Sequence, residues 1–552
     1  MNTLNKILDE IKNQKITILG WGLSFVGILF VRFILESLSS PTATGIIPSD
    51  PYTLIHYILF FLSLTIGTSI ILGYFTKDYT VSPKIILFGL PLLWLAPIVD
   101  IIFSHGKGYR MMYVFDTGNR IIFNFFTFFG TNFTSGATYG MRIGIALSII
   151  GIGFYIWLQS KKIVKSVLGA LVIYILVFIV GSLPGVIYTL SHINSSTSTN
   201  SEVVFYLEKI INQSTIYHNT LREGVSSVSR GRLIELTFDK LISQILFILS
   251  FVFAGFLFWK IDSKKFWVII KNARLERVNF YTASLLCGMG FAYINNLGNK
   301  LVWIDIFGVL CLIFSWISLW MYAVHTNDVI DIEIDKISNK NRPLVKKEVD
   351  KEEMGDIGKA WLAFALLGSW CAGFYPFFMS LVYVATSYIY SSPPLRLRRF
   401  PIVSSFLIGI ACLSTILAGF FFISVYKQIQ AFPILLAVGI VVMVTLAINF
   451  KDIKDIEGDK ENGIVTLPIL FGKNGVKVVA VCFAISILTV PFFLSFPLLY
   501  FISIPSAIAG YKIITQKPYR EKPIFVLRFV FLASIGFFYI LFYYLAHVYN
   551  LI

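Results

Sequence analysis

The sequence predicts an all-α polytopic membrane protein, and both composition and patterning support this fold class. Of its 552 residues, 56% are hydrophobic and 14% are charged, whereas a soluble globular chain carries about 25% charged residues. The mean hydropathy is +0.77, and apolar runs occur from one end of the chain to the other. The hydrophobic residues suffice for roughly fifteen membrane helices of about 20 residues each. A soluble fold is therefore excluded.

The net charge does not indicate a nucleic-acid partner, and the cysteines do not indicate a metal site or disulfides. The chain has 46 Lys and Arg against 30 Asp and Glu, a net charge of +16, which on a soluble protein would indicate a nucleic-acid partner. Polytopic proteins instead place Lys and Arg in short cytoplasmic loops, so we expect membrane lipids and no nucleic acid as partners. The five cysteines lie inside apolar runs without C-x-x-C spacing, which predicts packing residues rather than metal ligands or disulfides.

The first six predicted spans form an N-terminal membrane domain, residues 1–270, to which the sequence assigns no function. Connections rich in lysine alternate along this block, and the positive-inside rule places them in the cytoplasm. A polar excursion at 192–236 then lies on the opposite side of the membrane. The six spans are expected at 16–36, 54–74, 84–104, 141–158, 166–190 and 238–260.

One segment conflicts with this alternation. Residues 105–142 should be external, yet they contain Lys107, Arg110, Arg120 and Arg142 beside the aromatic run IIFNFFTFF. Two interpretations are open: an ordinary amphipathic connector, or a segment in the membrane interface that binds anionic lipid, with its cations on headgroups and its phenylalanines in the acyl boundary.

The next nine predicted spans form a C-terminal domain, residues 271–552, that enters the membrane from the cytoplasm. The loops after the second, fourth, sixth and eighth spans then face the cytoplasm, and they hold the strongly charged segments of this domain. We therefore expect a multi-pass protein of the cell membrane whose functional face is cytoplasmic. The nine spans are expected at 279–297, 303–325, 358–376, 378–390, 402–424, 432–450, 476–494, 495–511 and 526–547.

Acidic residues are scarce in the chain but gather in two of these cytoplasmic loops. Nine of the thirty Asp and Glu residues occupy nineteen positions, 327–335 and 452–461. Both clusters contain the spacing D-x-x-D-x-x-x-D, which on a helix would place three carboxylates on one face. Each cluster follows a span that ends in the cytoplasm, where the helix macrodipole disfavours anions. The six aspartates at this spacing are Asp328, Asp331, Asp335, Asp452, Asp455 and Asp459.

These carboxylates predict a site for a divalent cation. Like charges at such spacings repel one another, and the neighbouring lysines offset only part of the charge. Oxygen ligands without His or Cys favour a hard cation, Mg²⁺ before Ca²⁺ or Zn²⁺. Because Mg²⁺ is usually held by one or two carboxylates together with substrate phosphates, the clusters predict a phosphorylated substrate, such as a diphosphate, at the cytoplasmic membrane surface.

Four motifs in residues 271–552 resemble those of the UbiA superfamily of intramembrane prenyltransferases. The first acidic cluster matches N-D-x-x-D-x-x-x-D and is followed by the family's R-P, and the second matches D-x-x-D-x-E-G-D. A third stretch, starting at Tyr390, is similar to Y-S-x-x-P-x-R-L-K with Arg398 in place of Lys. The R-x-N opening of the family is matched at 277–279.

The resemblance implies nine helices around a central cavity open sideways to lipid, and transfer of a prenyl group from a polyprenyl diphosphate to an acceptor with Mg²⁺. Departure of the diphosphate leaves an allylic carbocation, so metals must stabilise the leaving group and a dry cavity must protect the cation. The six aspartates would be both the catalytic residues and the Mg²⁺ ligands. The implied substrate-binding residues are Arg277, Asn279, Asn327, Arg342, Tyr390, Arg396, Arg398 and Lys451.

Two features near the motifs have alternative interpretations. Tyr390, Arg396, Arg398 and Arg399 belong to a loop that caps the site in the family, but they also fit a positive-inside anchor without further function. His325 lies two residues before the first motif. It would either contact the acceptor or phosphate, or end a helix at the membrane interface.

The acceptor is the least constrained part of the prediction. The second and third motifs are most similar to those of archaeal digeranylgeranylglyceryl phosphate synthase-like members, which favours geranylgeranyl transfer to a glycerol-phosphate lipid. An aromatic quinone precursor is the alternative acceptor.

Two other classes of protein compete with the prenyltransferase interpretation. A CDP-alcohol phosphotransferase requires a D-G-x-x-A-R signature that this sequence lacks, and a transporter would carry its acidic residues mid-span rather than at span ends.

Overall fold

The computed structural model describes residues 2–39, 51–104, 113, 119–131, 137–191, 200–222, 230–295, 297–298 and 300–548. These residues form α-helices and short 3₁₀ helices, with one isolated β-bridge between Gly298 and Ser424. The all-α prediction is therefore confirmed for the described part of the chain. Two compact units result: unit 1 comprises Met1–Leu221 and Val225–Lys264, and unit 2 comprises Arg222–Gly224 and Lys265–Ile552.

Unit 1 contains, within its described residues, six helical segments that are long and apolar enough to cross a membrane, one at each predicted span. The sequence prediction of a polytopic membrane block is confirmed here. The segments are α2 (Ile18–Ser39), α3 (Pro51–Thr76), the run of α4 (Ser82–Gly89), η1 (Leu90–Trp94) and α5 (Leu95–Phe103), α7 (Tyr139–Ser160), α8 (Ile163–Gly181) and α12 (Arg230–Ile261). The shorter helices of the unit are α6 (Asn119–Phe126), α9 (Leu183–Ser191) and α11 (Thr215–Arg222).

Two spans are less regular than their apolar patterns suggest. The third span changes from α-helix to 3₁₀ helix at Leu90 and back at Leu95, because Pro91 has no backbone N–H and its ring clashes with the preceding turn. The fifth span ends at Gly181, nine residues before the predicted end at 190, and α9 continues the chain after a short interruption. Hydrophobic runs predict where a span lies but not where its helix breaks.

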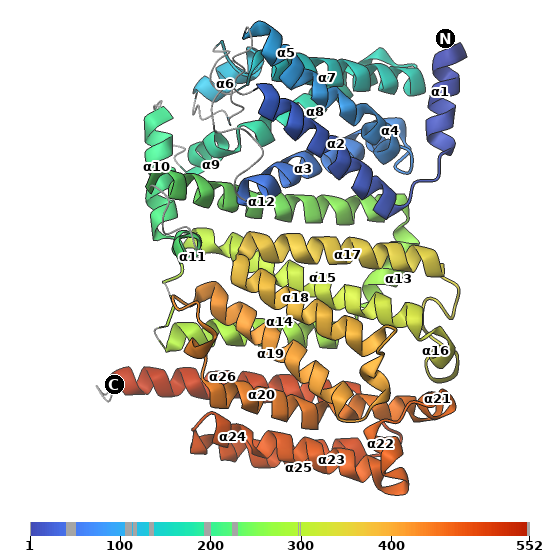
Figure 1. Ribbon diagram of the computed structural model, residues 1–552, viewed down its shortest axis with the longest axis vertical. Coiled ribbons are helices and arrows are strands. Elements are labelled where there is room, and N and C mark those ends of the chain that lie inside the picture. Colours follow the sequence, from blue (N-terminus) through green and yellow to red (C-terminus); the bar gives the residue numbers. More distant parts are fainter. Residues whose placement is uncertain are drawn as a thin grey trace. The chain divides into compact units, whose positions relative to one another are not determined.

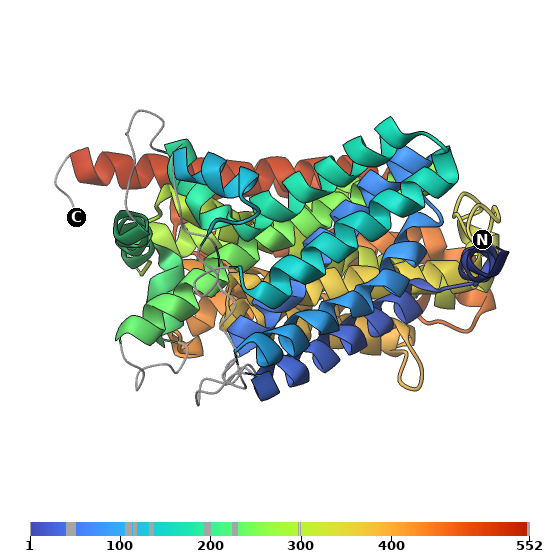
Figure 2. The same ribbon diagram turned by 90° about the horizontal axis from the view of Figure 1, so that it is seen from above.

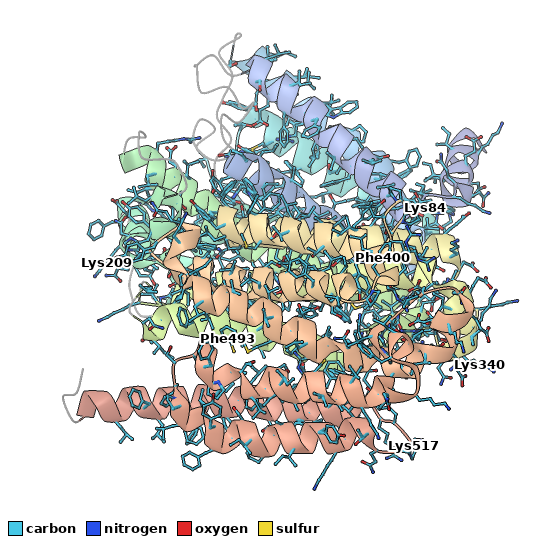
Figure 3. All side chains as sticks on the ribbon, turned by 60° about the horizontal axis from the view of Figure 1, so that its bottom comes forward. Lys84, Lys209, Lys340, Phe400, Phe493 and Lys517 are labelled. Carbon is cyan, nitrogen blue, oxygen red and sulfur yellow. The ribbon has the colours of Figure 1, made fainter. Side chains whose placement is uncertain are left out.

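Two helices of unit 1 lie across the direction of its spans. Helices α1 (Asn2–Asn13) and α10 (Asn200–Gln213) run vertically in Figure 1, where α12 runs horizontally and α2 obliquely, and both are seen nearly end-on in Figure 2. Figure 3 shows Lys84 near the α1 end of the unit and Lys209, on α10, at the opposite end. The two ends of the spans are thus distinct, as the alternating loops predict.

The segment 105–142 is described only in part, and Arg142 differs from the interfacial interpretation. Lys107 and Arg110 lie outside the described residues. The guanidinium of Arg142 is buried in α7 and donates a hydrogen bond to the carbonyl oxygen of Ala137 at 3.0 Å, because a buried charge needs polar partners. The expectation of a headgroup contact is therefore wrong for Arg142, which instead holds the loop before α7.

Unit 2 contains nine long helices within its described residues, one at each predicted span. Each helix packs against the next, and the last also packs against the first, so the nine close into a ring. Figure 1 shows α15, α17 and α18 as adjacent rows of this ring. The nine are α14 (Leu275–Ile294), α15 (Ile306–Ile330), α17 (Lys351–Ala372), α18 (Phe374–Ser391), α19 (Val403–Ile423), α20 (Ile434–Ala447), α23 (Gly475–Leu488), α25 (Tyr500–Thr515) and α26 (Lys522–Val548).

Two glycines let α14 and α19 meet across the ring. A Cβ atom at Gly288 would lie 1.9 Å from the carbonyl oxygen of Ile416, and one at Gly419 would lie 2.0 Å from the carbonyl oxygen of Leu285. The two helix backbones are therefore in direct contact, which only residues without a side chain permit. This crossing fixes the interior side of α14.

The charged loops of unit 2 gather at one end of the ring. Figure 3 shows Lys340 and Lys517 toward one end of the helices and Phe493 toward the other. The short helices of the loops are α16 (Ile332–Ser338), η3 (Leu397–Arg399), η5 (Ile448–Asp455) and α21 (Ile456–Glu461). These four elements carry most of the residues that the sequence motifs single out.

Candidate active site

The fold brings the two acidic motifs into direct contact. Helices α16 and α21 pack together, and a Cβ atom at Gly458 would lie 2.1 Å from Ser338 Oγ and 3.2 Å from the carbonyl oxygen of Ile334. Next to this crossing, Asn339 Nδ2 donates to one carboxylate of each motif, to Asp335 Oδ1 at 3.0 Å and to Asp455 Oδ1 at 2.9 Å. One amide thus joins carboxylates that are 120 positions apart in the chain.

Neither motif forms the single helical face that its spacing suggests. Helix α15 ends at Ile330 and α16 starts at Ile332, with Asp331 between them at φ −95° and ψ 19°. The second motif runs from the 3₁₀ helix η5 into α21. Three carboxylates on one face of a helix C-terminus would repel one another and oppose the macrodipole. The interruptions instead give the carboxylates different cationic partners.

A cavity of about 160 Å³ lies between the motifs and collects most of the predicted residues. Asn279 is exposed and is not among the lining residues, nor is Arg396. Of the six aspartates, three line the cavity and three are buried outside its lining. The predicted residues that line it are Arg277, Asn327, Asp335, Arg342, Tyr390, Arg398, Lys451, Asp452 and Asp455.

Arg398 connects the two motifs through carboxylates outside the cavity lining. Its guanidinium donates to Asp331 and, at 3.0 Å, to Asp459 Oδ1. Arg396 adds a second hydrogen bond to Asp331 at 2.9 Å. Burial lowers the pKa of Arg398, but the carboxylate of Asp331 and then the neighbouring Tyr390 and Asp459 outweigh it, so the net shift of its pKa is upward. The third motif therefore does more than anchor the loop, because it neutralises both aspartate clusters.

Asp328 has its own set of polar partners. Asn272 Nδ2 donates to its Oδ2 at 2.8 Å, and its Oδ1 lies 3.5 Å from a nitrogen of Arg274 and 3.7 Å from one of Arg342. Asp335, by contrast, lies at the cavity wall, where burial and then the charge of Asp328 raise its pKa to about 7. The charged form of this carboxyl therefore needs a cation nearby.

Cationic side chains face the cavity from several elements. Lys451 Nζ donates to Tyr390 Oη at 2.6 Å. Glu521, in the loop before α26, accepts from Arg277 at 2.5 Å and from Lys454 at 2.7 Å. The arrangement can neutralise a strongly anionic group.

Sequence reasoning missed five residues of this site, Asn272, Arg274, Asn339, Lys454 and Glu521. Arg274, Asn339 and Lys454 line the cavity, and the other two hold charged residues of the site in place. The only sequence signal that could have found them is proximity to a motif. Lys454 and Asn339 lie close to a motif in the sequence, whereas Glu521 does not. Their partners are set by the tertiary fold.

The donor set fits a hard divalent cation that a substrate helps to bind. Among the described residues, no group of three His, Cys, Asp or Glu side chains is placed to hold a metal ion alone. Two buried carboxylate oxygens, Asp328 Oδ1 and Asp459 Oδ2, accept no hydrogen bond, one in each motif. Oxygen donors in this number suit Mg²⁺, which completes its shell with phosphate oxygens.

His325 does not take part in the cavity. Its side chain is fully buried, its Nδ1 lies 2.6 Å from the carbonyl oxygen of Met321, and a Cβ atom at Gly358 of α17 would lie 3.3 Å from its own Cβ. It is not among the lining residues. His325 therefore makes no contact with this cavity and lies near the end of α15, packed against α17.

The C-terminal half of the chain is similar in sequence to known proteins. The model of the UbiA prenyltransferase family matches residues 281–535. Digeranylgeranylglyceryl phosphate synthase of Sulfolobus acidocaldarius is 30% identical over 198 residues, which cover 35% of this chain and 68% of that enzyme. Glycinol 4-dimethylallyltransferase of Glycine max is 29% identical over 176 residues, 30% of this chain and 43% of that enzyme. The chain thus spans less than half the length of this plant relative.

A solved structure is similar at lower identity. The UbiA homolog from Archaeoglobus fulgidus bound to GPP and Mg²⁺ is 17% identical, with a TM-score of 0.40 over 50% of this chain and 99% of that one. The family itself rests on sequence. Because its motifs meet around one cavity and identity of 30% extends over 68% of an archaeal member, the chain belongs to the UbiA prenyltransferase family.

Proposed function

We propose that unit 2 transfers a prenyl group from a polyprenyl diphosphate to a lipid or aromatic acceptor, with Mg²⁺, at the cytoplasmic side of the membrane. One observation carries the proposal. Two aspartate motifs, joined by Asn339 and by Arg398, face one cavity whose wall also carries several cations. Carboxylates that hold a metal and cations that neutralise phosphate oxygens are the groups that departure of a diphosphate requires.

The residues divide between holding the metal and binding the diphosphate. Asp335, Asp452 and Asp455 line the cavity and would hold Mg²⁺, together with the oxygens of Asp328 and Asp459 that accept no hydrogen bond. When bound, Mg²⁺ stabilises the negative charge that develops on the leaving group. Arg342 and Lys451 line the cavity, and we assign them to direct binding of the diphosphate oxygens.

The apolar part of the cavity suits a prenyl chain. Trp320, Tyr281 and Tyr383 line it, with ring centroids 5.5 Å apart from Tyr281 to each of the other two. Aromatic faces attract a cation, and a dry wall keeps water from an allylic carbocation. We therefore assign these three rings to the first isoprene unit of the donor.

A glycerol-phosphate lipid is the preferred acceptor. The support comes from the archaeal relative, which matches over a larger share of its length than the plant aromatic prenyltransferase does. An aromatic quinone precursor is the second candidate, since the plant relative transfers a prenyl group to an aromatic compound by its name. A set of acceptors analysed by product mass decides between them.

The cytoplasmic placement rests on the positive-inside rule, because the loops around the site hold most of the Lys and Arg of unit 2. We further propose that the domain boundary lies near residue 270, which the division of the chain beside Lys265 supports. Labelling of Lys340→Cys by a membrane-impermeant maleimide tests whether the site faces the cytoplasm. Reaction only from the external side would contradict it.

The activity is tested with membranes that contain the full chain, labelled geranylgeranyl diphosphate and Mg²⁺. We expect a prenylated product and released diphosphate, and loss of both in Asp331→Ala and Asp455→Ala. Asp356→Ala is the matched control, since this aspartate pairs with Lys359 on α17 outside the cavity lining. No diphosphate release with any acceptor would contradict the proposal, and release of CMP from a CDP-alcohol would favour a phosphotransferase.

A further inference from the structure

Unit 1 holds a second cavity, of about 700 Å³, a volume typical of small-molecule binding sites. Its lining extends along α3 from Thr53 to Thr68 and along α7 from Met141 to Leu158. At a rise of 1.5 Å per residue these stretches are about 22 and about 26 Å long. One leaflet contributes only about 15 Å of the hydrocarbon core. The cavity therefore suits an elongated ligand.

The polar residues of this cavity concentrate at one end. Of its five charged lining residues, Glu208 lies on α10 and Arg232, Glu235 and Asp239 lie in the first part of α12. The start of α3 adds Thr53 to this group. The opposite end, beside α1, is lined by aliphatic side chains, among them Leu8, Ile11, Ile86 and Leu158. A ligand that matches this lining has a hydrocarbon body and a small polar head.

The hydrogen bonds at the polar end define the head group. Thr53 Oγ1 donates to Asp239 Oδ2 at 2.9 Å. His56 Nδ1 lies 3.1 Å from the carbonyl oxygen of Asp239, and since a carbonyl only accepts, Nδ1 must carry the proton. In the neutral ring His56 Nε2 then accepts from Tyr113 Oη at 2.8 Å. The Tyr113 oxygen and the Asp239 carboxylate therefore present acceptor lone pairs, which suit a hydroxyl donor.

The charges of the lining do not suit a phosphate. Two lining arginines stand against three carboxylates, and both arginines are paired: Arg232 with Glu235 at 2.8 Å and Arg32 with Glu36 at 3.5 Å. In the cavity of unit 2 the balance is reversed. There the lining cations outnumber the carboxylates, with Arg274, Arg277, Arg342, Arg398, Lys451 and Lys454 against Asp335, Asp452 and Asp455. Among the described residues, the lining of unit 2 therefore offers a diphosphate more neutralising partners than the lining of unit 1 does.

We infer that unit 1 binds an uncharged long-chain alcohol, with the chain along α3 and α7 and the hydroxyl donating to Tyr113 Oη or the Asp239 carboxylate. The chain has two possible sources, an isoprenoid or a straight alkyl lipid, which share the chemistry of a hydrocarbon with one hydroxyl head. The inference is independent of the proposed function, because it uses no residue of the prenyl-transfer site.

The test is photoaffinity labelling of the purified full chain in lipid nanodiscs. The probe is geranylgeraniol with a diazirine at its far end, and cross-linked peptides are mapped by mass spectrometry, which separates labelling of unit 1 from labelling of unit 2. We expect unit 1 peptides from α3 and α7 to be labelled. Excess unlabelled geranylgeraniol should suppress the labelling and geranylgeranyl diphosphate should not. If octadecanol also suppresses the labelling, the ligand class is alkyl alcohols in general. If octadecanol does not suppress it, the ligand class is isoprenoid alcohols.

Three variants make the outcome decisive. Gly144 is buried in the lining, and a Cβ atom there would lie 4.0 Å from its nearest neighbours, so Gly144→Phe should fill the cavity without a backbone clash. Gly27→Phe on α2 is the control, because Gly27 is exposed, its Cβ would meet nothing within 4 Å, and it does not line the cavity. His56→Phe keeps a ring and removes the hydrogen bonds that orient Tyr113 and the Asp239 backbone at the polar end.

We expect Gly144→Phe to abolish labelling of α3 and α7, Gly27→Phe to leave it unchanged, and His56→Phe to weaken competition by the alcohol about tenfold, the effect of one lost hydrogen bond. Equal labelling in Gly144→Phe and Gly27→Phe, or stronger competition by the diphosphate than by the alcohol, would overturn the inference. Prenyl transfer is measured on the same samples, so failure of either proposal is seen separately.

Discussion

At the residue scale, Arg398 carries the largest single role, since one guanidinium ion-pairs with a carboxylate of each aspartate motif. The family pattern has Lys at this position. An ammonium group is a point charge and cannot reach two carboxylates in the fixed geometry of a guanidinium. In this chain, Asp331 and Asp459 therefore depend on Arg398 specifically.

We predict that Arg398→Lys lowers the rate of prenyl transfer about tenfold, because one charge-assisted hydrogen bond is worth roughly 1.5 kcal/mol. Arg398→Met should lose more, since it removes the ion pair of buried Asp459 and leaves Asp331 with Arg396 alone. Steady-state kinetics with labelled prenyl diphosphate measures both. Arg399→Lys is the control, because Arg399 is exposed and outside the cavity lining. Equal rates in Arg398→Lys and the unmodified chain would contradict the bridging role.

Glu521 positions two cations of the cavity, Arg277 and Lys454. Burial raises its pKa, but Arg277 and Lys454 outweigh burial and lower it to about 2. A depressed pKa stabilises the fold above the unfolded pKa of 4.5 and loses that contribution as the pH falls toward the folded value. At neutral pH the carboxylate is therefore fully charged.

We predict that Glu521→Gln lowers kcat about tenfold without raising the KM for the prenyl diphosphate. Without the carboxylate, Arg277 and Lys454 are free to bind the anionic diphosphate product more tightly, by roughly the energy of one polar contact. Slower product release follows from this stronger attraction. Kinetics at pH 7 and thermal unfolding between pH 7 and pH 2 measure the two consequences. The stability difference between Glu521→Gln and the unmodified chain should vanish toward the acid end, and a difference that grows there would contradict the pKa assignment.

Most charged residues of the site were predicted from motifs, while the residues that hold them were not. Asp331, Lys451 and Arg398 stand inside recognisable patterns. Asn272 and Glu521 act through partners that are 56 and 244 positions away in the chain, and no local pattern encodes such a contact. Asn279 shows the reverse case, because it matches the pattern and yet is exposed outside the cavity lining.

At the element scale, the crossing of α14 and α19 depends on the absence of two side chains. We predict that Gly419→Leu lowers the free energy of unfolding by about 3 kcal/mol, since overpacking forces the backbones apart. The new Cβ would otherwise lie 2.0 Å from the carbonyl oxygen of Leu285. Gly290→Ala, on the opposite helix α14, is the control because its Cβ meets nothing within 4 Å. Thermal unfolding in detergent compares the two, and similar midpoints would contradict the close approach.

The contact of α16 with α21 offers a reciprocal test. A Cβ atom at Gly458 would meet Ser338 Oγ at 2.1 Å and little else below 3.2 Å. We therefore predict that Gly458→Ala lowers prenyl transfer about tenfold, an effect of roughly 1.4 kcal/mol from a forced contact, and that adding Ser338→Ala restores most of it. Transfer rates of the two single variants and the double variant form the cycle. Additive losses would show that the two helices do not meet at this pair.

The hydrophobic runs of the sequence predicted the positions of the membrane helices but not the breaks within them. Each predicted span has a helix, because a membrane segment must satisfy its backbone groups internally. The break at Asp331 depends on charge partners elsewhere in the fold. The break at Pro91 is a local effect of the proline ring, which a hydrophobic run does not register. A spacing of three and four residues therefore predicted that carboxylates of a motif belong together, while the helical face it suggested was not formed.

At the scale of the whole molecule, every residue assigned to prenyl transfer lies in unit 2. The nine helices of that unit pack as a closed ring in which α26 contacts α14. A closed ring buries both of its terminal helices against neighbours of the same unit. Each of the nine helices thus packs against two neighbours within unit 2.

We predict that residues 265–552, expressed alone in membranes, retain prenyl transfer within about threefold of the full chain, since a change of that size corresponds to less than 1 kcal/mol. Labelled product is measured for both proteins at equal amounts in the membrane, with Asp455→Ala in each as the inactive control. A fragment that keeps its helical content by circular dichroism but forms no product would show that unit 1 takes part in transfer.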